Sequence, residues 1–126
     1  MFKEFKLDDI KSDGFIHSRV YEFICEPEKK LFKINLGFAD LIQGGAIVDC
    51  TVTITDWWHM EVFEYNKQQK VKQFDLDEIP EIDRIIKLSF NNDELILTDF
   101  GMHNNTAIDY KFTKPKIHIT GEYDPN

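Results

Sequence analysis

Apolar and polar residues alternate most regularly over residues 45–56. One face of this segment collects the apolar side chains of Ala46, Val48, Cys50, Val52 and Ile54. The opposite face collects Asp49, Thr51, Thr53 and Thr55. Successive side chains of a β-strand point to opposite faces, so this pattern predicts a strand with one face in the core and one wetter face.

Eight further segments rich in Phe, Ile, Val, Thr and Tyr show noisier strand patterns. They are residues 15–25, 30–37, 57–65, 69–74, 86–91, 94–100, 106–113 and 116–122. Turn-forming residues separate them, and the Asn91-Asn92-Asp93 turn is flanked by apolar residues at strand spacing on both sides. Short turns between strands indicate antiparallel hairpins, so we expect about nine antiparallel strands.

One short helix is predicted over residues 77–86, because Ile79, Ile82 and Ile86 recur at three- and four-residue steps. With Asp77 as the N-cap, Pro80 falls in the first turn, where its missing N–H is harmless. The fold expected is therefore mainly β (α+β), in a single domain over residues 1–126. Its architecture is a curved antiparallel sheet, sandwich or partial barrel with the helix on an edge or end.

The composition supports one globular domain, since the 126 residues are 42% hydrophobic and 30% charged. No apolar run approaches the roughly 20 residues that span a membrane, and the first residues lack the apolar stretch of a signal peptide. We therefore expect a cytoplasmic protein without membrane association. The net charge of −8 disfavours nucleic acid, which binds clustered Lys and Arg.

Cys25 and Cys50 are the two cysteines, and each falls in an apolar strand pattern without a Cys-x-x-Cys pair. This placement is typical of reduced thiols in a protein core. A disulfide between them is the alternative if their strands pair.

The sequence shows no recognisable catalytic, cofactor or metal motif. His59 and Glu61 are two apart and share a strand face, as in fragments of several metal sites, but no Pro-Cys-x-x-Cys or His-Glu-x-x-His motif accompanies them. The other histidines, His17, His103 and His118, are scattered. We therefore expect a surface histidine at position 59, no metal and no cofactor.

Trp57 and Trp58 are adjacent, so on a strand they face opposite ways. One indole is then expected in the core and the other on a binding surface, where Trp is enriched. The alternative is a sandwich in which the helix covers the second face and buries both rings.

Acidic residues concentrate between positions 75 and 99, where eight carboxylates face two bases, Arg84 and Lys87. They are Asp75, Asp77, Glu78, Glu81, Asp83, Asp93, Glu94 and Asp99. Such a run is either a solvated face or a patch that steers a cationic partner. The residues predicted to bind a partner are Asp77, Glu78, Glu81, Asp93, Glu94, Asp99, Trp57 and Trp58.

An acidic, aromatic-rich single β-domain of this kind resembles the immunity proteins of bacterial toxin systems, such as those of contact-dependent growth inhibition. The segment Ile54-Thr55-Asp56-Trp57-Trp58 is similar in style to some of them. The resemblance implies tight cytosolic binding to one cognate toxin, often a nuclease. Two alternatives stay open: a small-ligand binder with an apolar cavity lined by Phe and Trp, and an enzyme that gathers residues from separate strands.

Overall fold

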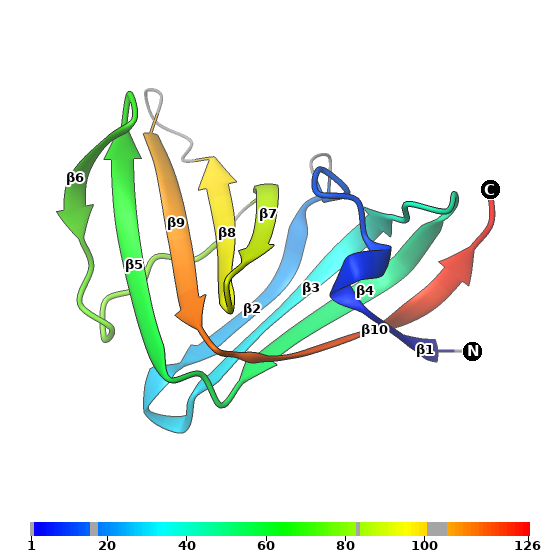
Figure 1. The fold of residues 1–126 in the computed structure, drawn as a ribbon, viewed down its shortest axis with the longest axis horizontal. Helices are drawn as coiled ribbons and strands as arrows, with labels where there is room; N and C mark the ends of the chain where they lie inside the picture. Colours follow the sequence, from blue (N-terminus) through cyan, green and yellow to red (C-terminus); the bar gives the residue numbers. More distant parts are fainter. Residues whose placement is uncertain (1, 16–17, 83, 101–105) are drawn as a thin grey trace.

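The computed structural model describes residues 2–15, 18–82, 84–100 and 106–126. These residues form two five-stranded antiparallel sheets that do not close into a barrel (Figure 1). The strand order is β1-β10-β4-β3-β2 in the first sheet and β6-β5-β9-β8-β7 in the second. The mainly β fold predicted from the sequence is confirmed.

The first sheet contains β1 (Phe2–Phe5), β10 (Lys116–Asp124), β4 (Ala46–Thr55), β3 (Leu31–Asp40) and β2 (Val20–Glu26). The second contains β6 (Gln69–Gln73), β5 (His59–Asn66), β9 (Thr106–Thr113), β8 (Glu94–Phe100) and β7 (Ile85–Asn91). The helical elements found in the described residues are two 3-10 turns, η1 (Leu7–Asp9) and η2 (Pro27–Lys29). No helix in the described residues is therefore long and apolar enough to cross a membrane.

Two pairs of strands bend at one corner and link the sheets. β4 leads into β5 and β9 leads into β10, and antiparallel pairing resumes on each side of the bend. At the bend, Asp56 and Lys114 take left-handed φ values of 54° and 50°. The Trp58 N–H donates to the Thr113 carbonyl at 2.8 Å and holds the two links together. The corner thus carries paired strands from one sheet into the other.

The core lies between the sheets and is centred on aromatic rings. The ring of Phe32 lies 5.0 Å from that of Phe112 and 5.9 Å from that of Tyr110, between ring centres. The same core includes Ile10 and Phe15 from the N-terminal segment, which lies across the first sheet beside the second sheet (Figure 1). The inner face of the first sheet is therefore covered by two different parts of the chain.

The alternation predicted for residues 45–56 is correct over the second half of β4 and wrong near its start. Ile47 is buried, whereas Val48 is 37% exposed. Asp49 has a left-handed φ of 52°, and the pairing of β4 with β10 shifts by one residue there. This β-bulge reverses the faces of the residues that precede it, because a one-residue shift exchanges the two sides of a strand.

The helix predicted over residues 77–86 is wrong. Residues 74–82 form an irregular segment that crosses from β6 to β7, at opposite edges of the second sheet, and Ile85 already begins β7 (Figure 1). Proline disfavours helical backbone in the residue before it, so Pro80 pushes Ile79 towards extended structure. Ile79 and Ile82 still pack on the core, but as anchors of this crossing segment. Asp83 lies outside the described residues.

Candidate protein-binding surface

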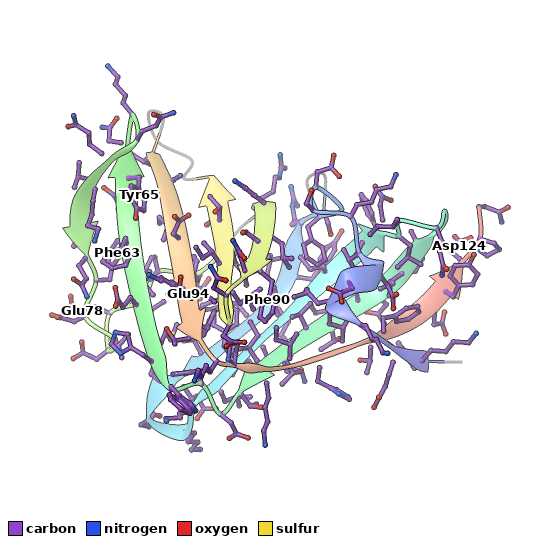
Figure 2. The ribbon with its side chains drawn as sticks, viewed as in Figure 1. Phe63, Tyr65, Glu78, Phe90, Glu94 and Asp124 are labelled. Carbon is purple, nitrogen blue, oxygen red and sulfur yellow. The ribbon has the colours of Figure 1, made fainter. Side chains whose placement is uncertain are left out.

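Residues 75–81 form an exposed acidic loop within the crossing segment. Its four carboxylates belong to Asp75, Asp77, Glu78 and Glu81, all exposed. Within the described parts of the chain, none of them lies within 4.0 Å of a basic nitrogen in an ion pair. Figure 2 shows Glu78 outside the sheet on the side of β5 and β6. Leu76, between the acids, is 41% exposed and adds an apolar contact surface.

The acidic loop is held at both ends by contacts to the core. The Phe74 N–H donates to the Val62 carbonyl at 2.9 Å, and the Tyr110 hydroxyl donates to the Pro80 carbonyl at 2.7 Å. Burial raises the pKa of Tyr110, and the neighbouring Asp99 and Cys25 raise it further, so the hydroxyl stays protonated and able to donate. The loop therefore presents its carboxylates from a fixed backbone.

A second exposed surface lies at the corner between the sheets; we call Trp58, Asp93, Glu94, Lys111 and Lys114 the corner surface. Trp58 is 71% exposed, and Lys114 Nζ lies 3.9 Å from the centre of its ring. The Lys114 N–H donates to the Asp93 carbonyl at 2.7 Å, and Lys111 pairs with Glu94 at 3.2 Å. The structure thus brings three of the predicted partner-binding residues to one place: Trp58 from the β4–β5 link, and Asp93 and Glu94 from the β7–β8 hairpin.

Trp57 and Asp99 do not reach the surface, which corrects their prediction as partner-binding residues. Trp57 is 3% exposed and packs on Phe112, with ring centres 5.1 Å apart. The adjacent tryptophans, which lie in the link between β4 and β5, therefore divide between core and surface, and the alternative that buries both is wrong. Asp99 is 4% exposed, and its Oδ1 accepts the Arg84 N–H at 3.2 Å. It links Arg84, just before β7, to β8.

His59 is a surface residue, as predicted. Its Nε2 lies 2.7 Å from Glu61 Oε1, while 63% of the His59 side chain is exposed. His118 pairs instead with Glu4 at 3.4 Å, and His17 and His103 lie outside the described residues. In the ranges that the structure covers, no group of three His, Cys, Asp or Glu side chains is placed to hold a metal ion.

Both cysteines are free thiols, as predicted; Cys50 is buried and Cys25 half-buried. Burial raises the pKa of Cys25 to about 11, with a smaller contribution from the charge of Glu28. Burial likewise raises the pKa of Cys50 to about 12, with Asp49 contributing next. Because the thiolate is the nucleophile, both groups are held in their unreactive form at neutral pH.

In the native protein, both thiols are expected to react slowly with a chromogenic disulfide reagent at pH 8. After denaturation, the reagent should detect two reactive thiols per chain. Alkaline pH should also lower the free energy of unfolding. Each folded thiol keeps its proton above its ordinary pKa of 9.0, so the stability contribution is complete below pH 9 and is lost as pH rises towards 11 to 12. Urea unfolding at a series of pH values measures this fall. Rapid labelling of the native protein, or a count of zero, would contradict the expectation.

An open groove of about 500 Å³ was not predicted, because its walls come from separate segments. It lies between the N-terminal segment and β7 and includes Leu7, Asp8, Ile10, Ile42, Leu88 and Phe90 in its lining. The sequence indicates this groove only weakly, because its apolar lining residues follow the same pattern as ordinary core residues.

Comparison of the chain with protein-family models, with curated proteins and with solved structures finds no match.

Proposed function

We propose that this chain binds a basic protein partner and neutralises it by direct contact, in the manner of the immunity proteins of bacterial toxin systems. One observation carries the proposal: the acidic loop holds four exposed carboxylates without an ion-pair partner in the described chain. These charges lie on a backbone that is anchored to the core on either side. Like charges held close together repel one another, and an oppositely charged surface relieves that repulsion.

A fixed loop suits this role because association loses less conformational entropy when the binding residues are already ordered. The field of a chain with net charge −8 also speeds the encounter with a basic surface. The corner surface supplies a second contact. Its Trp58 is exposed, and tryptophan is enriched among the residues that contribute most of the binding energy in protein interfaces. Glu78 and Glu94, one from each surface, lie at a similar height of the second sheet (Figure 2).

Charge reversal in the acidic loop is expected to slow association with the partner. The partner is first recovered by pull-down on the immobilised wild-type chain and its toxic activity is assayed with and without the chain. Asp77→Lys with Glu78→Lys should lower the association rate about tenfold or more at low salt, with the difference shrinking as salt screens the charges. Surface plasmon resonance at several ionic strengths measures these rates, and neutralisation of the partner should weaken in parallel.

The matched control is Glu22→Lys with Glu28→Lys, which changes the net charge equally at two exposed positions, one on β2 and one in the neighbouring η2 turn. This control should alter the association rate far less. Equal slowing by both pairs would show that only overall charge matters. An unchanged rate in the loop variant across all salt concentrations would remove the acidic loop from the mechanism, and circular dichroism verifies that all variants fold.

A further inference from the structure

The groove beside β7 combines an apolar lining with an acidic rim. Ile10 and Leu88 are buried in its wall, whereas Ile42 and Phe90 are 64% and 46% exposed. Figure 2 shows Phe90 between the β7–β8 hairpin and the first sheet. Exposed apolar side chains that gather in one concave place mark a binding surface more often than singly scattered ones do.

The register of the hairpin shows which main-chain groups face this groove. Asn92 and Asp93 have φ values of 53° and 63°, as in a two-residue hairpin turn whose flanking residues exchange hydrogen bonds. Pairing alternates along antiparallel strands, so Leu88 and Phe90 direct their N–H and C=O groups away from β8. The Leu88 N–H indeed donates to the Ser12 carbonyl at 3.3 Å.

The next outward-facing groups along β7 are those of Phe90. Among the described residues, neither its outward N–H nor its outward C=O has a hydrogen-bond partner. An unpaired strand edge of this kind is a template for another strand, because each added main-chain bond satisfies a donor or an acceptor.

The opposite edge of the second sheet is protected in a way that the end of β7 near Phe90 is not. β6 carries Lys70 and Lys72, and a β-bulge at Glu64 and Tyr65 distorts its pairing with β5. Lysines and bulges on edge strands prevent pairing with other chains. β7 has these features only near its start, where Lys87 and a shift of register between Ile85 and Lys87 occur. The residues from Leu88 to Phe90 contain no charged side chain, so this end of the β7 edge lacks that protection.

We propose that the groove binds an extended segment of a partner protein, which adds as a short strand to the edge of β7 at Phe90. The segment places an apolar side chain against Ile42 and Phe90. It places a basic side chain near Asp8 and Asp13, two exposed carboxylates at the groove that outnumber its one lysine. This surface lies at the sheet edge opposite β6, so the inference does not depend on the acidic loop.

The experiment uses a capped synthetic peptide of sequence Lys-Val-Thr-Val-Lys-Val and follows amide hydrogen exchange of the full chain by NMR. At saturation, exchange of the Phe90 amide should slow about tenfold or more, because that N–H becomes hydrogen-bonded. A peptide N-methylated at alternate residues keeps the side chains but loses donors, and a scrambled peptide keeps the composition but loses the alternation. Neither should protect Phe90.

Two variants with the same change in net charge separate this site from general attraction to an acidic protein. Asp8→Lys with Asp13→Lys should weaken peptide binding about tenfold, whereas Asp77→Lys with Glu78→Lys should change it less than about twofold. Equal weakening by both pairs, or equal binding of the N-methylated peptide, would overturn the proposal. Protection of Phe90 that grows with protein concentration alone would also overturn it, since a second copy of the chain would then be the occupant.

Discussion

Replacement of Val52 by Asp is expected to unfold the protein. Val52 is 1% exposed and lies opposite Ile34 on β3 and Ile119 on β10, both of them buried. A carboxylate without a partner in this position costs several kcal/mol, against a total stability of about 5–15 kcal/mol for a domain of this kind. Far-UV circular dichroism and size-exclusion chromatography should show loss of the native fold at neutral pH.

Thr53→Asp is the matched control, one residue along the same strand. Thr53 faces the outer side of the first sheet, where its neighbours across β3 and β10 are Lys33 and His118. A carboxylate beside these groups stays solvated and near positive charge, so its effect on the free energy of unfolding should remain within about 1 kcal/mol. Equal loss of structure in both variants would mean that β4 is buried on both faces.

Replacement of Tyr110 by Ala is the second substitution for which a large loss is expected. The ring is fully buried against Phe32, so its removal leaves a cavity that costs about 3–5 kcal/mol in urea unfolding. Tyr110→Phe keeps the ring and removes only the donor to the Pro80 carbonyl, at a cost of about 1–3 kcal/mol.

The Phe variant also tests whether this hydrogen bond holds the acidic loop. Amide hydrogen exchange of residues 74–82 should become faster in Tyr110→Phe, while exchange in β4 should change only by the loss of global stability. Unchanged exchange in the crossing segment would show that Ile79 and Ile82 anchor the loop without the hydrogen bond.

Strand periodicity predicted most of the fold, because alternation on half-buried strands is a direct consequence of sheet geometry. Each of the nine predicted segments contains a strand, although its ends differ by several residues in places such as 15–25, where β2 begins at Val20. β1 was missed, since four residues ending at Phe5 are too few to show a period. The bulge at Asp49 was also not predictable, because it depends on pairing with β10.

The helix prediction failed because two kinds of apolar spacing look alike over a short segment. Three- and four-residue steps place side chains on one side of a helix, but an irregular segment that crosses a sheet also needs an apolar anchor every few residues. The β-branched pair Ile85-Ile86 and the proline at position 80 favoured extended structure, and tertiary contacts decided the outcome.

The candidate site was partly predictable. Asp77, Glu78 and Glu81 are exposed, as the concentration of acidic residues between positions 75 and 99 indicated. Asp99 was misplaced, although strand phase contained the warning: it follows Leu95 and Leu97 at two-residue steps and therefore shares their buried face. Trp58 and Asp93 both contact Lys114, and this arrangement depends on how β4–β5 and β9–β10 bend together, which no local sequence pattern indicates.

The strand order of the first sheet bears on how the chain reaches its fold during synthesis. Among the described strands, β10 is made last, and it is inserted between β1, which is made first, and β4. Until β10 is present, the facing edges of β1 and β4 remain unpaired, and the corner lacks the link from β9 to β10. Closing these long-range pairings is slow, and the nascent chain meanwhile exposes strand edges that attract other chains. Folding of the first sheet is thus completed only after β10 has left the ribosome.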